Sequence, residues 1–208
     1  MSEPNSSEHA LILSLEPSGE SYLKLSALSA ESGAFLCLKR RSKKNPLKDA
    51  PDLFDTADIS LETARSGTTR FVKDYRTINR RLAIGNSYKK LLHASEFAKL
   101  IANNAPLMGD YPALFKLCEQ SLDAFAERSY PEIIHLKSLY RLLYTEGYPV
   151  RESWWPKLQD SLKTEARVLL NQPTPETMEN ALEESVNDVM QSLQNWLQHE
   201  TDFKLPQS

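Results

Sequence analysis

The sequence contains only two cysteines and six glycines, and it has no long apolar run. Cys37 and Cys118 stand far apart and neither belongs to a Cys-x-x-Cys pair, so a zinc ribbon has no ligands and both thiols are expected to be buried and reduced. The glycines occur singly, which excludes a glycine-rich phosphate loop. No stretch approaches the roughly 18 apolar residues of a membrane-spanning helix. Residues 1–8 lack the apolar core of a signal peptide, so we expect a cytoplasmic protein.

The sequence also lacks a recognisable catalytic or metal-binding pattern. Its four histidines, His9, His93, His135 and His199, fall in four different predicted elements and have no metal-ligand spacing. No serine or cysteine stands in a nucleophile-elbow or Cys–His context. The sequence therefore predicts that the protein is not an enzyme and that it holds no metal and no other cofactor.

Positive charge, by contrast, is abundant in one region. The net charge is −3, yet residues 39–90 hold fourteen lysines and arginines against six acids, whereas residues 171–208 hold one lysine against seven acids. Six of the cations lie within ten residues: Lys39, Arg40, Arg41, Lys43, Lys44 and Lys48. A solvated loop is the simpler interpretation, but so dense a cluster exceeds what solubility requires and predicts binding to nucleic-acid phosphates.

A second group of cations follows on a predicted strand and just beyond it. Alternate residues of a strand share a face, so this group is expected to extend the same surface. The alternative is that these strand cations are simply exposed to solvent and bind nothing. Its members are Arg70, Lys73, Arg76, Arg80 and Arg81. Tyr22 and Phe35 are candidates for stacking on bases, with packing in the core as the favoured alternative for Phe35.

The first eighty residues have the period of short strands, so the fold class is predicted as α+β with an N-terminal five-stranded OB-like β-barrel. The alternating runs cover residues 9–15, 22–27, 34–39, 57–64 and 69–77. Five strands at this spacing fit an OB-fold, and periodicity alone leaves an SH3-like barrel open. The leucines expected to fill the interior are Leu11, Leu13, Leu15, Leu23, Leu25, Leu36 and Leu38.

The rest of the chain has helical periodicity and predicts an all-α domain. The expected organisation is a disordered N-terminus over 1–8, the OB-like domain over 9–80, the helical domain over 81–200 and a tail over 201–208. Ser129 and Glu132 fit a capping box that opens one helix, and Gly147 can end it in a left-handed conformation. Thr174 and Pro175 are expected to begin the last helix.

Two stretches resemble the RecO family of recombination mediator proteins. The first runs from Ala10-Leu-Ile-Leu-Ser-Leu15 through Gly19-Glu20-Ser21 and Ser29-Ala-Glu-Ser-Gly33 to a strand and the basic loop. The second runs from Leu114-Phe115 through Leu122 and Leu136-Lys-Ser-Leu-Tyr-Arg-Leu-Leu143 to Glu146-Gly-Tyr-Pro149, and it is similar to that family's Phe-x-x-x-Leu-Leu-x-x-x-Gly-Tyr helix. The order of these pieces, a strand barrel followed by helices, also matches the family.

The resemblance implies a DNA-binding and strand-annealing protein of recombinational DNA repair. It implies RecR and the acidic tail of single-stranded DNA-binding protein as partners, and single- or double-stranded DNA as ligand. One segment departs from the family, because Arg151–Pro156 stands where many members carry a Cys-x-x-Cys zinc module. That departure and the net negative charge favour an alternative function, a protein–protein adaptor whose degenerate barrel has little affinity for DNA.

Overall fold

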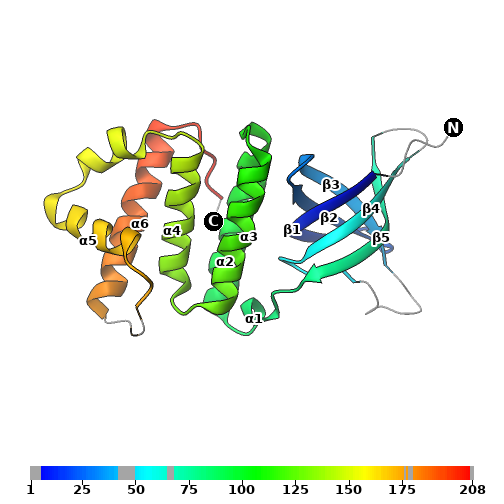
Figure 1. The fold of residues 1–208 in the computed structure, drawn as a ribbon, viewed down its shortest axis with the longest axis horizontal. Coiled ribbons are helices and arrows are strands. Elements are labelled where there is room, and N and C mark those ends of the chain that lie inside the picture. Colours follow the sequence, from blue (N-terminus) through cyan, green and yellow to red (C-terminus); the bar gives the residue numbers. More distant parts are fainter. Residues whose placement is uncertain (1–5, 42–49, 65–67, 176, 178–179, 207–208) are drawn as a thin grey trace. The chain divides into compact units, whose positions relative to one another are not determined.

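The computed structural model describes residues 6–41, 50–64, 68–175, 177 and 180–206 (Figure 1). Five strands come first and helices follow, which confirms the predicted α+β order. The strands are β1 (Ser6–Ser18), β2 (Tyr22–Ser29), β3 (Gly33–Arg40), β4 (Thr56–Thr63) and β5 (Arg70–Asn79). β1 therefore begins inside the segment that the sequence assigned to a disordered N-terminus.

The five strands form a closed barrel in the order β1-β2-β3-β5-β4, with β4 pairing back onto β1. Every neighbouring pair is antiparallel except β3 and β5, which are parallel and joined at Leu38–Phe71 and Lys39–Val72. This order fits the OB-like barrel that the sequence predicted.

The barrel interior matches the prediction on β2 and differs on β3. Its buried cluster consists of Ala10, Ile12, Leu25, Ala27, Phe35, Cys37, Ala57, Ile59, Leu61, Val72 and Tyr75, with Leu15 and Leu23 packed against it. On β3 the expected interior residues were Leu36 and Leu38, and this was wrong because Phe35 and Cys37 point inward and Leu36 is 59 % exposed. Both faces of β3 are apolar, so alternation alone did not define which face turns inward.

On β1, the prediction that Leu11, Leu13 and Leu15 share the interior face was also wrong. The strand pairing shifts by one residue between Ile12 and Ser14, and an extra residue at such a bulge exchanges the two faces. Ile12 thus faces the interior before the bulge and Leu15 after it. Leu11 and Leu13 lie outside the interior cluster, yet both are buried.

The helical elements follow the barrel. They are α1 (Leu82–Gly85), α2 (Tyr88–Asn104), the 3-10 turn η1 (Ala105–Leu107), α3 (Tyr111–Glu127), α4 (Pro131–Thr145), the π-helical turn η2 (Val150–Trp154), the 3-10 turn η3 (Trp155–Lys157), α5 (Asp160–Asn171) and α6 (Asn180–Glu200). Among the described residues, no helix is both long enough and apolar enough to cross a bilayer.

The chain divides into two compact units that are not continuous in sequence. The first contains residues 1–81 and 105–119, and the second contains residues 82–104 and 120–208. Residues 105–119, which the sequence placed in the helical domain, therefore group with the barrel. In the tail, Phe203 is buried and the backbone of Lys204 exchanges hydrogen bonds with the Asn104 amide, so the described tail residues belong to the second unit.

The helix boundaries correct two predictions and agree with a third. α4 is preceded by Tyr130 in a left-handed conformation, and its first turn has no side-chain cap, so the predicted Ser129–Glu132 capping box is wrong. Thr174 and Pro175 precede α6, which begins only at Asn180. Gly147 has φ +78°, as expected for a glycine that ends α4.

Gly33 provides a test of the packing in the first unit. It has φ +68°, and a Cβ added to it would lie 2.6 Å from the Tyr111 ring, whereas Gly19 has φ +62° and nothing within 4 Å. Both glycine-to-alanine changes are expected to cost about 1–2 kcal/mol for the left-handed backbone. Gly33→Ala should cost about 1 kcal/mol more, because the ring must move. Urea unfolding measures the free-energy cost of each variant. In a protein that also carries Tyr111→Ala, the extra cost of Gly33→Ala over Gly19→Ala should disappear. An extra cost that is the same with and without the Tyr111 ring would contradict this packing.

Candidate nucleic-acid interface

The side chains that alternate with the interior residues form an exposed surface on β2, β3 and β5. We call this surface the outer face, and it consists of Tyr22, Lys24, Leu36, Leu38, Arg40, Phe71 and Lys73. The strand register places Tyr22 beside Arg40, Lys24 beside Leu38, and Leu38 beside Phe71. The surface combines aromatic and aliphatic groups with cations, the composition that single-strand binders use to contact bases and phosphates together.

Two aromatic rings lie next to each other on the outer face. The ring centroids of Tyr22 and Phe71 are 5.9 Å apart at an interplanar angle of 59°, and both side chains are only partly buried. Sequence reasoning named Tyr22 but paired it with Phe35, which fills the interior instead. Phe71 alternates with the inward-facing Val72, and this sequence signal could have placed Phe71 on the outer face. Its position next to Tyr22 could be known only from the closed barrel.

The cations of the outer face differ in how far they are neutralised. Lys24 forms an ion pair with Glu16 at 2.7 Å, and Lys73 forms one with Glu62. Arg40 and Arg41 are exposed and form no ion pair with another described residue, and the Arg41 amide donates a hydrogen bond to the Ser21 carbonyl at 2.8 Å. Arg40 on this face and Arg41 directly after β3 therefore hold the most available positive charge at this end of the strand.

Lys39 and Arg70 belong to the interior side of their strands. The Lys39 ammonium lies 5.6 Å from the centre of the Tyr75 ring, and the Arg70 guanidinium lies 5.5 Å from that of Phe35. Both contacts have the geometry of cation–π interactions. Near them, burial raises the pKa of the Cys37 thiol to about 12, and the two cations only partly oppose that shift. The thiol is thus protonated at neutral pH.

Arg76 is exposed but bound to an acid of the neighbouring strand. Its guanidinium forms an ion pair with Asp58, which also accepts a hydrogen bond from His9 at 2.8 Å. These hydrogen bonds from His9 and Arg76 lower the pKa of the Asp58 carboxyl. The Arg76 charge is therefore balanced on the surface of the barrel itself.

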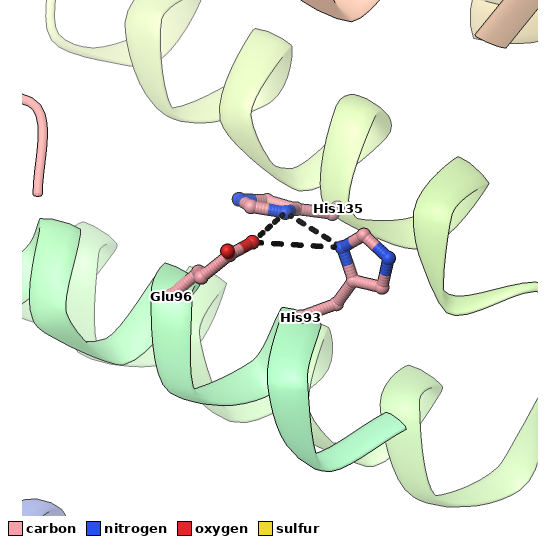
Figure 2. Close-up of side chains that lie close together, drawn as sticks. All are labelled: His93, Glu96 and His135. Carbon is pink, nitrogen blue, oxygen red and sulfur yellow. Dashed lines mark hydrogen bonds and ion pairs between the residues drawn. The ribbon is translucent and has the colours of Figure 1, made fainter. Parts of the chain in front are cut away.

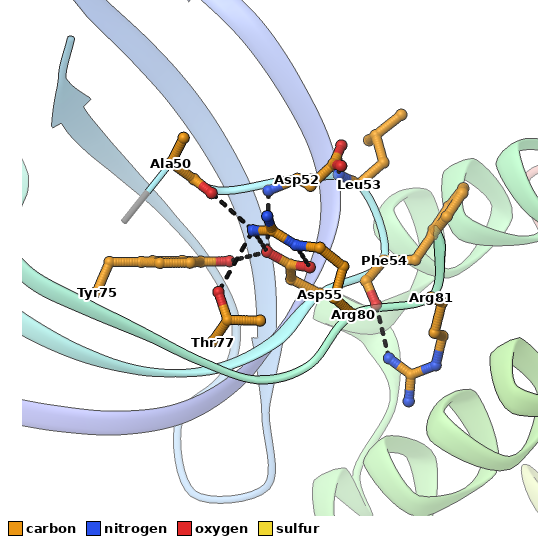
Figure 3. Close-up of polar contacts among 9 residues, drawn as sticks. All are labelled: Ala50, Asp52, Leu53, Phe54, Asp55, Tyr75, Thr77, Arg80 and Arg81. Carbon is orange, nitrogen blue, oxygen red and sulfur yellow. Dashed lines mark hydrogen bonds and ion pairs between the residues drawn. The ribbon is translucent and has the colours of Figure 1, made fainter. Parts of the chain in front are cut away.

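Arg80 is part of a buried polar network between the segment before β4 and the end of β5 (Figure 3). The Asp55 carboxylate is fully buried and accepts hydrogen bonds from Arg80 Nε and Nη2, from the Tyr75 hydroxyl at 2.9 Å, and from the Asp52 amide. Arg80 Nη2 also donates to the Ala50 carbonyl at 2.7 Å. Hydrogen bonding to Asp55 raises the pKa of Arg80, and burial raises the pKa of Tyr75.

Arg81 is buried beside this network. Its side chain is 2 % exposed, and Nη1 donates hydrogen bonds to the Phe54 carbonyl at 2.6 Å and to the Thr56 hydroxyl at 3.1 Å. Phe54 has φ +66°, a strained conformation for a bulky residue, and Arg81 helps to hold it. Arg80 and Arg81 thus stabilise the barrel, and the geometry gives no support to their predicted contact with phosphates. Lys43, Lys44 and Lys48 lie outside the described residues.

No protein-family model matches this sequence, and no curated protein matches it significantly.

The second unit brings together two histidines that the sequence assigned to separate elements. His93 of α2 and His135 of α4 have their Nδ1 atoms 3.2 Å apart, with Glu96 next to both (Figure 2). His9 lies on β1 in the barrel unit, and His199 lies near the end of α6. Residue spacing could not reveal this cluster because its members come from two helices that meet only in the folded unit.

Arg80 and Arg76 offer a matched test, since both are arginines of the same chain segment that pair with an aspartate. Arg80→Ala would leave the buried Asp55 carboxylate without its main partner. We expect this change to lower the free energy of unfolding by about 2–4 kcal/mol, somewhat less than for a fully enclosed pair because Arg80 is partly exposed. Arg76→Ala should cost less than about 1 kcal/mol. Urea unfolding measures both values, and equal costs would show that Arg80 has no structural role.

Proposed function

We propose that the protein binds single-stranded DNA on the outer face of its barrel and promotes annealing of complementary strands, as a non-enzymatic factor of recombinational DNA repair in the cytoplasm. The observation that supports this most directly is the Tyr22–Phe71 pair beside Arg40, which forms no ion pair with another described residue. OB-like barrels bind oligonucleotides on the face formed by strands 2 and 3 and the adjoining loops, and Tyr22 lies on β2 while Phe71 lies on β5 next to β3.

The proposed contacts divide into two kinds. Tyr22 and Phe71 would stack on successive bases, which is sequence-tolerant because every base has a π face. Arg40 and Arg41 would bind phosphates, and the basic segment with Lys43, Lys44 and Lys48 directly follows them in the chain. Annealing needs no catalytic residue, because neutralised phosphates repel each other less and two strands can then pair. The resemblance to the RecO family is consistent with this function and suggests RecR as a further partner.

Binding measurements can separate the two kinds of contact. Tyr22→Ala should weaken binding to a labelled oligothymidylate by about 1–3 kcal/mol with little change in salt dependence, because it removes a stacking contact. Arg40→Ala with Arg41→Ala should weaken binding to all sequences and flatten the slope of log K against log[salt] by about 0.7 per lost contact. Fluorescence anisotropy at several salt concentrations measures both effects.

Arg167→Ala, which removes an exposed cation of α5, is the control for a general loss of charge and should change neither affinity nor slope. Thermal unfolding confirms that each variant is folded, as expected for outward-facing side chains. Wild-type protein that fails to bind at low salt would contradict the proposal and favour the adaptor function. Unchanged binding by the Arg40/Arg41 variant would remove these arginines from the site.

A pocket in the second unit favours a second activity, the docking of an acidic peptide. The pocket has a volume of about 330 Å³, and its described lining contains Arg128, Lys137 and Arg141 but no acidic side chain. Lys137 is partly buried, and burial lowers its pKa. An incoming carboxylate would compensate the poorly hydrated cation. The acidic tail of single-stranded DNA-binding protein, the partner suggested by the family resemblance, has the required charge.

A labelled peptide with the sequence of such an acidic tail tests this docking site. Arg128→Ala with Arg141→Ala should weaken peptide binding at least about tenfold, since a hydrogen bond between charged groups contributes roughly 1.5–3 kcal/mol. Lys163→Ala on α5 is the matched control and should have no effect. The outer-face variants should bind the peptide normally. Equal affinity of the Arg128/Arg141 variant and wild type would exclude the pocket.

A further inference from the structure

The donor atoms of His93, Glu96 and His135 lie close enough together to bind one metal ion. His93 and Glu96 are one turn apart on α2, and His135 faces them from α4 (Figure 2). The Nδ1 atoms of the two histidines are 3.2 Å apart, and Glu96 Oε2 lies 3.7 Å from each of them. We propose that these three side chains bind a divalent transition-metal ion, with Zn²⁺ as the best fit. This proposal differs from the sequence-based expectation of a protein without metal.

The three distances are mutually consistent with one central ion. Three atoms separated by 3.2, 3.7 and 3.7 Å share an equidistant point about 2.1 Å from each. Zinc is bound at about 2.0–2.1 Å by imidazole nitrogen and about 2.0–2.2 Å by carboxylate oxygen. An ion at that point would lie in the plane of the three donors, and a tetrahedral ion would need only slightly shorter separations between Glu96 and the two imidazoles.

Hydrogen bonding does not account for the whole arrangement. The Nδ1 atoms of the two imidazoles are within hydrogen-bonding distance at 3.2 Å, but a separation of 3.7 Å is too long for a hydrogen bond between Glu96 and either ring. Two imidazole nitrogens and a carboxylate oxygen gathered around one point form a donor set that a divalent metal ion can bind.

The charges around the cluster also favour a cation. The groups that act electrostatically on His93 are Glu96 and Glu132, which favour positive charge there, and Lys89, which opposes it. Glu132 lies one turn before His135 on α4 and is 7 % exposed, and its Oε2 has no hydrogen-bond partner among the described residues. A buried carboxylate that lacks a partner is costly, and a doubly charged ion nearby would compensate it.

The environment also fixes the ligand positions and leaves one side open. The His135 ring is held between Phe97 and Phe125, with ring centroids at 6.3 and 6.4 Å. Glu96 and His135 line a cavity of about 370 Å³ in the second unit, so this side of the cluster borders open space. Three protein ligands with one open position are typical of exchangeable zinc sites, whereas structural sites are closed by four. The absence of thiolate and the presence of imidazole favour Zn²⁺, Co²⁺ or Ni²⁺ over Mg²⁺ and Ca²⁺.

Metal titration of the full-length protein, after removal of metal with a chelator, tests the site. Calorimetry with Zn²⁺ should give one ion per chain, and Co²⁺ should produce the visible absorption of a four-coordinate ion with nitrogen and oxygen ligands. Zn²⁺ at about a hundredfold excess over its dissociation constant should raise the unfolding midpoint by about 5–10 °C, because the ion binds only the folded unit.

Variants at the two more exposed ligands decide the assignment. His93→Gln and Glu96→Gln should each weaken Zn²⁺ binding at least about tenfold and abolish the Co²⁺ spectrum while circular dichroism shows that the helices are intact. His199→Gln on α6 is the matched control and should leave both signals unchanged. No stoichiometric binding by the wild type, or binding that persists in both ligand variants, would overturn the proposal. Because DNA binding resides in the other unit, these results are independent of the proposed function.

Discussion

The short parallel pairing between β3 and β5 is the contact on which the barrel unit depends. It joins only Leu38 to Phe71 and Lys39 to Val72, yet it closes the sheet and removes both of its edges. Closure also brings Phe71 next to Tyr22, although the two residues are far apart in sequence. The aromatic surface that we propose as the DNA-binding site therefore exists only in the closed barrel, and neither strand could form it alone.

Charge pairing then determines which cations remain available to a ligand. Residues 39–90 are strongly basic in sequence, but the acids among them lie opposite particular cations: Asp55 opposite Arg80, Asp58 opposite Arg76, and Glu62 opposite Lys73. These pairs reduce the excess charge on the β4–β5 side of the barrel. The exposed and unpaired charge of the described barrel is concentrated at Arg40 and Arg41, next to the aromatic pair. The proposed interface is thus defined by where the cations lie relative to acidic side chains, rather than by the number of cations.

The sequence predicted the fold class because β2 and β4 alternate clearly between apolar and polar residues, and Leu25 faces inward as expected. It failed where local pattern was not decisive. β3 is apolar on both faces, and the bulge after Ile12 exchanges the faces of β1 without a glycine or proline to mark it. The His93–His135 contact depends on how α2 packs against α4, so no spacing rule could have found it. The burial of cations such as Arg81 could not be predicted from the sequence either, because composition alone predicts that arginine is exposed.

Burial has opposite consequences for charged groups in the two units. In the barrel, the buried side chain of Asp55 accepts hydrogen bonds from Arg80 and Tyr75, so the arginine is committed to the fold. In the helical unit, burial lowers the pKa of His135 to about 3, so this imidazole is uncharged at neutral pH. It faces the imidazole of His93 and the carboxylate of Glu96, and these three side chains are the ones that we propose as metal ligands. Burial thus commits the charge of Arg80 to the barrel fold, whereas it leaves His135 without a charge.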